Sequence, residues 1–298
     1  MELATQSKAL INAALELDGG AKYRGLLGEA VKEIGDAFEP EQEKHPRKHL
    51  GASLIGRECT RFLWLSWRWA FWKKFDARML RLFNRGHLEE ARWIALVRAA
   101  GFHTVHLDNG KQIRISGAGG HYGGSLDGMI FGCPEVPNEW GLLEFKTFSL
   151  KTFLKLVKDG VQTSKHEHYV QCQQYMAKHN LSFALYCAVC KDNDEIHLEI
   201  IRADRINAGL YEARATTVVS AVAAPTKCSA SPLYQTCKWC DAYSVCHENQ
   251  PIMKTCRSCQ HVLVCDNGVW WCGHKNKILT AEEQFAACET YILSSMFR

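Results

Sequence analysis

Apolar residues recur along this chain of 298 residues at two different spacings, and the spacing of three and four predicts its helices. That spacing is typical of one buried helical face, and it alternates here with charged positions. The segment RLFNRGHLEEARWIALVRAAG shows the pattern most clearly. We therefore expect helices over a charge-rich leader at 1–48, over 81–101, over 167–180, and over a segment ending near Ala224.

Shorter apolar runs, bounded by glycine, proline and asparagine, predict strands. Residues 103–116 indicate a hairpin that turns at Asp108-Asn109-Gly110, since Asn-Gly favours tight hairpin turns. Further strands are expected at 123–132, 140–148, 181–190 and 195–203. This order of helices and strands predicts an α/β (α+β) fold with a mixed central sheet flanked by helices.

The pattern changes from Cys228 onward, where cysteines, aromatic residues and turn residues replace the periodic apolar positions. We place a boundary near residue 250. The expected organisation is a helical leader at 1–48, a catalytic core at 49–250 and a small module at 251–298. The chain shows no internal repeat and no low-complexity segment.

Composition narrows the class of protein. With 47% hydrophobic residues the chain is too apolar to be disordered, and no apolar run is long enough for a membrane helix. The N-terminal segment lacks the features of a secretion signal, so we expect a cytoplasmic protein with no membrane partner. The net charge of +4 argues only weakly for a nucleic-acid partner, whereas 14 cysteines in a reducing compartment indicate metal ligation.

The strand at 140–148 carries Glu144 and Lys146, which share one face, while Leu143 and Phe145 point to the other. If Asp127 lies on a neighbouring strand, its carboxylate meets that of Glu144 and forms an oxygen site suited to Mg²⁺ or Mn²⁺. Lys146 would then orient or deprotonate a water molecule. The alternative is an ordinary ion pair on a solvated strand.

A further element follows this pair. The helix at 167–180 places Gln171 and Tyr175 on one face, four residues apart. In that order, Asp127, Glu144-x-Lys146 and Gln171-x-x-x-Tyr175 resemble the PD-(D/E)XK nuclease superfamily, in particular its RecB-like and lambda-exonuclease-like branch. Leu126 stands where the superfamily's name has proline, a tolerated variation.

The resemblance implies a restriction-endonuclease-like core and hydrolysis of DNA. It also implies an acidic residue or histidine on a preceding helix beside the metal, for which Glu90 and His87 are candidates. Glu90 is favoured because it stands four residues after Gly86, as in phage exonucleases, while His87 fits the histidine of RecB. The backbone carbonyl of Phe145 commonly supplies another metal ligand in this family.

By the same resemblance, Gln171 and Tyr175 lie beside the active centre and contact DNA or position the lysine. The alternative is an ordinary amphipathic helix with one polar and one aromatic position.

Four cysteines resemble a second family feature, a single cysteine before the nuclease core and C-x2-C-x5-C after it. AddB and the CRISPR-associated RecB-like exonucleases hold a [4Fe–4S] cluster in this way, which implies a structural cluster in this chain. Its ligands would be Cys59, Cys237, Cys240 and Cys246. A zinc site with the same cysteines and buried free cysteines are alternatives, and Cys228 is a substitute ligand. The remaining core cysteines, at 133, 172, 187 and 190, are expected to pack as small apolar residues.

The tail holds another set of cysteines, which resembles a zinc ribbon. Its expected Zn²⁺ ligands are Cys256, Cys259, Cys272 and Cys288, although His274 is an alternative to the third or fourth. A segment of this size has too little core to fold unaided, so a metal would stabilise it. Contact with DNA and contact with a protein are equally open roles for it.

Basic and aromatic residues alternate between Arg57 and Lys74, a mixture suited to stacking bases and neutralising phosphates. A helix with so many aromatic residues is, however, more often packed against the core. Phosphate contacts by Lys151 and Lys155, just after the catalytic strand, are equally plausible.

The resemblance thus predicts a divalent-metal-dependent DNA exonuclease, from a phage or prophage, acting in a bacterial host's cytoplasm. It would resect DNA ends for recombination or repair so that a single-strand annealing recombinase loads. A CRISPR-associated or AddB-like nuclease shares this chemistry with another partner. A non-catalytic DNA-binding scaffold that keeps the nuclease fold is the alternative of another class.

Overall fold

The computed structural model describes residues 1–37 and 45–297, so part of the predicted leader, 38–44, lies outside the described residues. Contacts divide the chain into two compact units, which are described separately. The first consists of Met1–Pro40, Phe75–Ile115 and Ser125–Ala208, and the second of Glu41–Lys74, Ser116–Gly124 and Gly209–Arg298. These units interleave along the sequence, whereas the boundaries at 48 and 250 follow changes in composition and stay predictions.

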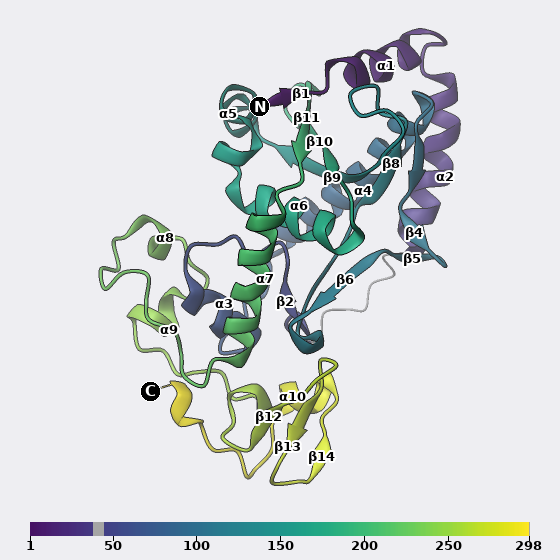
Figure 1. The fold of residues 1–298 in the computed structure, drawn as a ribbon. Coiled ribbons are helices and arrows are strands. Elements are labelled where there is room, and N and C mark those ends of the chain that lie inside the picture. The colour runs from purple at the N-terminus through teal and green to yellow at the C-terminus, as the bar shows by residue number, and fades with distance from the viewer. Residues whose placement is uncertain (38–44, 298) are drawn as a thin grey trace. The chain divides into compact units, whose positions relative to one another are not determined.

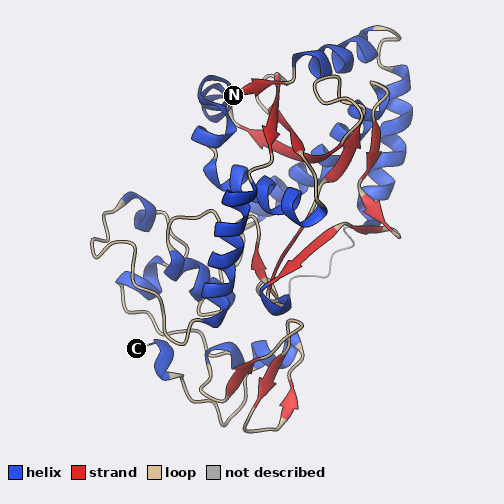
Figure 2. Ribbon diagram, viewed as in Figure 1, coloured by secondary structure: helices blue, strands red, loops and turns tan. Residues whose placement is uncertain are grey.

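A six-stranded mixed sheet forms the centre of the first unit, in the order β1-β11-β10-β9-β8-β3 (Figures 1 and 2). Only β9 and β10 run parallel, and every other neighbouring pair is antiparallel. The mixed sheet with flanking helices that the sequence predicts is therefore present. Its strands are β1 (Glu2–Leu3), β3 (His103–Val105), β8 (Gly128–Phe131), β9 (Trp140–Phe148), β10 (Phe183–Cys190) and β11 (Ile196–Arg202).

Helices cover both faces of this sheet. They are α1 (Thr5–Glu16), α2 (Ala21–Ala37), α4 (Ala77–Ala99), α5 (Leu150–Ser164) and α6 (His166–His179). All eight residues of β10 are buried, as expected for a strand covered on both faces. Leu143 and Phe145 join the core cluster that also contains buried residues of α1, α2 and α4. By alternation, Glu144 and Lys146 face the opposite side of β9, and α6 also contacts this strand.

The first unit differs from the sequence prediction in some details. The expected strand at 123–132 is two strands, β7 (Tyr122–Ser125) and β8, separated at Leu126 and Asp127. The predicted hairpin at 103–116 is present only at its tip, between β4 (Leu107–Asp108) and β5 (Lys111–Gln112), with Asn109 and Gly110 at φ values of 50° and 74°. Residues 103–105 pair instead with β8, and residues 114–117 lie beside β7 in another sheet. Helix α5 was not predicted, although its apolar and polar residues are well separated on two faces and only Gly160, at a φ of 73°, interrupts it near its end.

The second unit contains short elements around a core rich in tryptophan. Three of its elements cross the division between the units: β6 (Arg114–Gly117), β7 and α7 (Arg205–Ser220). The others are β2 (Leu50–Gly51), α3 (Thr60–Trp67), α8 (Gln235–Lys238), α9 (Tyr243–His247), β12 (Val262–Val264), β13 (Trp270–Cys272), β14 (Lys277–Ile278) and α10 (Ala281–Ala286). Strands β12, β13 and β14 form a small sheet of their own.

Tryptophans of the basic and aromatic segment are packed inside this unit. Trp64, Trp67 and Trp69 are buried, and the guanidinium carbon of buried Arg257 lies 3.8 Å from the ring centroid of Trp69. Because buried rings offer no face to a base, these three tryptophans fit the packing alternative and not base stacking.

No helix among the described residues is both long and apolar enough to cross a membrane.

Candidate active site

The pairing of β8 with β9 brings Asp127 next to Glu144. Gly128 pairs with Leu143 in this antiparallel ladder, so Asp127, one residue before β8, falls opposite Glu144. The side chain of Asp127 accepts a hydrogen bond from the main-chain N–H of Phe145, with 2.7 Å between Oδ2 and N. The sequence placed Asp127 on a strand, and the structure places it in the bend just before one.

Glu144 is fully buried on β9, and its Oε1 is paired with Nζ of Lys146 on the same face. The other oxygen of the carboxylate, Oε2, is also buried but has no hydrogen-bond partner among the described residues. An unsatisfied buried carboxylate oxygen is costly, and functional sites are where such atoms are retained.

The electrostatics of the site follow from burial and from the closeness of its charges. Burial raises the pKa of Glu144 to about 8, and the charge of Asp127 adds to this, while Lys146 opposes it. Burial likewise raises the pKa of Asp127, against the effect of Lys146 and of the Phe145 N–H. Burial would lower the pKa of Lys146, but the carboxylates of Glu144 and Asp127 outweigh it and raise that pKa. The site therefore carries an excess of carboxylates over cations.

Helix α4 contributes the third carboxylate. The pKa of Glu90 is raised to about 7. Burial is the largest cause and the neighbouring charge of Asp127 acts in the same direction, while His87 and Lys146 oppose the shift. Glu90 thus belongs to the same electrostatic group. His87 lies 3.7 Å from Glu90 between Nδ1 and Oε1 and is half-exposed. Its contact with Glu90 raises the pKa of His87. The structure thus brings both candidates to the site, with Glu90 the more deeply buried.

Helix α6 lies against the same strand. Gln171 and Tyr175 are both buried, and Nε2 of Gln171 lies 3.3 Å from the Tyr175 hydroxyl, so the expected common face is present. Cys172, the next residue after Gln171, is buried within electrostatic range of Glu144, Lys146 and Asp127. Burial of Gln171 and Tyr175 favours positioning over direct contact with DNA.

Sequence reasoning missed a second polar pair at this place. Tyr186 on β10 pairs in register with Glu144, and its hydroxyl lies 2.7 Å from Nδ1 of His168. The pKa of His168 is lowered to about 3, mainly by burial and also by the charge of Lys146, so the imidazole is neutral. The available signal was its position three residues before Gln171, on the same helical face.

The donor set fits a divalent cation, although no preformed cage is present. Among residues 1–37 and 45–297, no three His, Cys, Asp or Glu side chains are arranged as a metal site. A carboxylate site without its cation is expected to show unsatisfied oxygens and raised pKa values. Here Oε2 of Glu144 is buried without a partner among the described residues, the carboxylate of Asp127 lies nearby, and the pKa of Glu90 is raised. Carboxylate oxygens of this kind are the preferred ligands of Mg²⁺ and Mn²⁺.

The cysteines expected to hold the iron–sulfur cluster gather in the second unit. Cys59, Cys237, Cys240 and Cys246 all line one pocket, and Cys228 lines it as well. The Sγ atoms of Cys228 and Cys237 lie 3.7 Å apart. Thiolates are the ligands that iron–sulfur clusters take, although within the described residues these cysteines are not already arranged as a metal site.

The tail cysteines also lie together. Cys256 is within electrostatic range of Cys259, Cys272 and Cys288. The main-chain N–H of Lys275 points to Sγ of Cys272 at 3.4 Å. Such N–H···S contacts stabilise a thiolate, so this donor set suits Zn²⁺. His274 stacks on His261, with ring centroids 5.2 Å apart. The other core cysteines, at 133, 172, 187 and 190, are all fully buried, as predicted.

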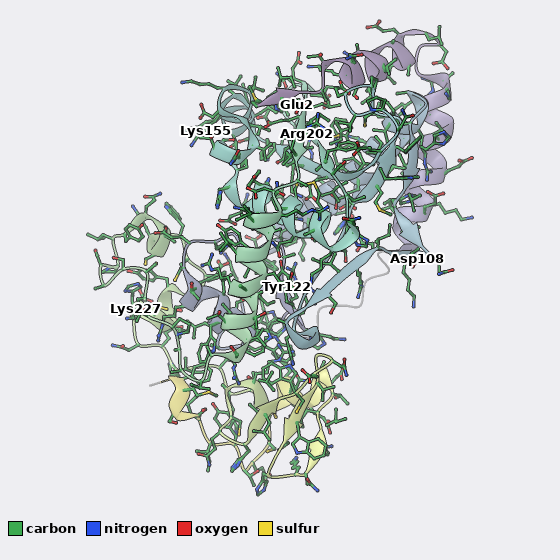
Figure 3. All side chains as sticks on the ribbon, viewed as in Figure 1. Glu2, Asp108, Tyr122, Lys155, Arg202 and Lys227 are labelled. Carbon is green, nitrogen blue, oxygen red and sulfur yellow. The ribbon has the colours of Figure 1, made fainter. Side chains whose placement is uncertain are left out.

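Candidate DNA contacts outside the site lie on α5. Lys151 and Lys155 are both exposed on this helix, which directly follows β9. Figure 3 labels Lys155.

Comparisons with known proteins find similarity only among solved structures. No family model matches the chain, and no curated protein matches it in sequence. Among solved structures, an alkaline exonuclease of Laribacter hongkongensis, LHK-Exo, is similar with a TM-score of 0.41 and 18% identity over 58% of this chain and 86% of that one. Its complex with dAMP gives a TM-score of 0.42 with the same identity and coverage.

Proposed function

We propose that this chain is a divalent-metal-dependent DNA exonuclease with a restriction-endonuclease-like core. One observation carries the proposal: Asp127, Glu144 and Lys146 converge at the β8–β9 pairing, and a buried carboxylate oxygen of Glu144 is left without a partner. The choice of DNA as substrate comes from the order of these residues and of Gln171 and Tyr175, which resembles that of RecB-like nucleases.

Each residue has a distinct task in this proposal. Asp127 and Glu144, with the carbonyl of Phe145, would hold one or two Mg²⁺ or Mn²⁺ ions, and Glu90 or His87 completes the site. The metal supplies polarisation of the phosphodiester and a lower pKa for water. Lys146 donates hydrogen bonds to the attacking water and directs it at phosphorus, and its charge stabilises the charge that develops there. Gln171 and Tyr175 hold their own helix, α6, in place beside the site.

The metal modules would be structural. A [4Fe–4S] cluster bound by Cys59, Cys237, Cys240 and Cys246 links segments that are almost 180 residues apart, and closing so long a loop stabilises the fold. Zn²⁺ at Cys256, Cys259, Cys272 and Cys288 would hold the tail module. In its cellular role the protein resects DNA ends in the cytoplasm, for a phage recombination system in which a single-strand annealing recombinase is the partner.

The test uses the full chain, purified without oxygen, with end-labelled duplex and single-stranded DNA. We expect Mg²⁺-dependent release of nucleotides from DNA ends, with Lys146→Ala reducing the rate by about 10² to 10⁴-fold. The matched control is Lys32→Ala, an exposed lysine on α2. Equal rates in the wild type and Lys146→Ala would remove the proposed site, and a wild type that binds DNA but releases no nucleotides would favour a DNA-binding scaffold. Internal cuts in circular DNA would identify an endonuclease instead.

A further inference from the structure

The pocket of the proposed cluster contains one thiol more than a cluster needs. Five cysteines line it, together with basic residues, and all five belong to the second unit. A [4Fe–4S] cluster takes four thiolates, one for each iron. The cysteines are Cys59, Cys228, Cys237, Cys240 and Cys246.

The five thiols are not evenly spaced. Cys59, at the start of α3, has a side-chain interaction with Cys228 and a charge interaction with Cys240 and with Cys246. Cys228 and Cys237 are in direct contact, with 3.7 Å between their sulfur atoms. Because each iron of a cluster takes its own thiolate, and the cluster body keeps those thiolates apart, two touching thiols compete for one iron.

Both competing thiols are held at this place by neighbouring contacts. Lys227, next to Cys228, donates a hydrogen bond from Nζ to the carbonyl of Cys246. The label of Lys227 in Figure 3 shows where this region lies in the fold. On the other side, Tyr234 and Thr236 donate hydrogen bonds of 2.6 and 2.5 Å to the Glu58 carboxylate, which stands beside Cys59. The loop before α8 therefore cannot carry Cys237 away from Cys59 without breaking these bonds.

The two thiols differ in exposure. Cys237 is buried, whereas Cys228 is partly exposed and lies on the loop that follows α7. In the assembled protein the buried thiol is therefore the better resident ligand, and the partly exposed thiol is left beside it without an iron of its own.

We propose that Cys228 is an alternate ligand of the metal centre, able to take the iron otherwise bound by Cys237. The inference rests on the proposed iron–sulfur cluster and extends its ligand set. It assigns the redundancy to the corner of the pocket where the sulfur atoms of Cys228 and Cys237 are in contact.

The experiment compares alanine variants of the full chain purified without oxygen, by iron and sulfide content and by the visible absorbance and electron paramagnetic resonance of the reduced cluster. Wild type should contain about four irons. Cys228→Ala and Cys237→Ala should each keep the cluster, the second with a changed resonance spectrum, while Cys59→Ala and the double variant Cys228→Ala/Cys237→Ala should lose it. Cys265→Ala, an exposed cysteine outside the pocket, is the control.

The outcomes separate the two proposals. Wild type without iron overturns the cluster and this inference together. Wild type with iron, but a Cys237→Ala variant without it, overturns only the alternate ligand, provided that circular dichroism shows this variant folded. A double variant that retains the full iron content also overturns it, because some other residue would then bind that iron.

Discussion

The carboxylate of Asp127 and the main-chain N–H of Phe145 are joined by a hydrogen bond of 2.7 Å between Oδ2 and N. This bond extends the β8–β9 ladder by one side-chain contact beyond its last backbone pair, Gly128 with Leu143. It therefore orients the carboxylate of Asp127 through one of its two oxygens. The position of a candidate metal ligand is in this way tied to the register of the sheet.

The first prediction separates the charge of Asp127 from its hydrogen bond. Asp127→Asn keeps an oxygen acceptor for the Phe145 N–H, so we expect stability close to that of the wild type and a loss of Mn²⁺ binding. Asp127→Ala loses both, and a buried N–H without a partner costs about 1–3 kcal/mol. Urea unfolding and calorimetric Mn²⁺ titration measure the two effects. Equal stability of the two variants would show that the bond contributes nothing.

The second prediction concerns stability and pH in metal-free protein. The pKa of Glu144 is about 8 in the folded protein against an ordinary 4.5, so the folded state binds the proton more tightly. The stability from this group is present below pH 4.5 and is lost as pH rises toward 8. Glu144→Gln should therefore become progressively more stable than the wild type between pH 5 and pH 8, as urea midpoints would show. A constant difference would contradict it.

The third prediction is that metal binding releases protons. The pKa of Glu90 is about 7 and that of Glu144 about 8, so both carboxyls hold protons that a cation must displace near neutral pH. The affinity for Mn²⁺ should rise with pH between about 6 and 8. Calorimetry in buffers of different ionisation enthalpy counts the released protons, and Glu90→Gln should reduce the count. No dependence on the buffer would refute the prediction.

The fourth prediction concerns Tyr175. Since its hydroxyl is buried against Nε2 of Gln171, Tyr175→Phe should cost about 1 kcal/mol of stability and lower the rate of hydrolysis. DNA affinity, measured by fluorescence anisotropy in Ca²⁺ to limit cleavage, should stay unchanged. A weakened affinity with unchanged stability would instead indicate direct contact between Tyr175 and DNA.

The fifth prediction concerns the tail. Cys256→Ser/Cys259→Ser should lose about one zinc per chain, and hydrogen exchange should then accelerate in β12 and β13 but not in β9 or β10. Cys265→Ser, which alters an exposed cysteine of the same tail, is the control. Unchanged exchange in β12 and β13 would show that the tail is ordered without metal.

Sequence reasoning predicted those parts of the fold whose signals are local. Alternation on β9 was enough to place Glu144 and Lys146 on one face, and the Asn109-Gly110 turn followed from its dihedral preference. It missed the break at Leu126 and Asp127, although Asp127-Gly128 is a turn signal, because the glycine-rich segment was interpreted as one continuous strand. It also missed the pair of His168 and Tyr186, because that contact depends on how α6 packs against β10.

Strand β1, at Glu2 and Leu3, pairs with β11 near Ile200, and Glu2 and Arg202 form an ion pair of 2.6 Å (Figure 3). A ribosome synthesises residues 2 and 3 long before residues 196–202, so the first strand has no partner during most of translation. The sheet therefore acquires this edge only after β11 has left the exit tunnel, and until then β1 is open to chaperones and to fused tags. Expression with a bulky N-terminal fusion would hinder this last pairing, and a C-terminal tag avoids it.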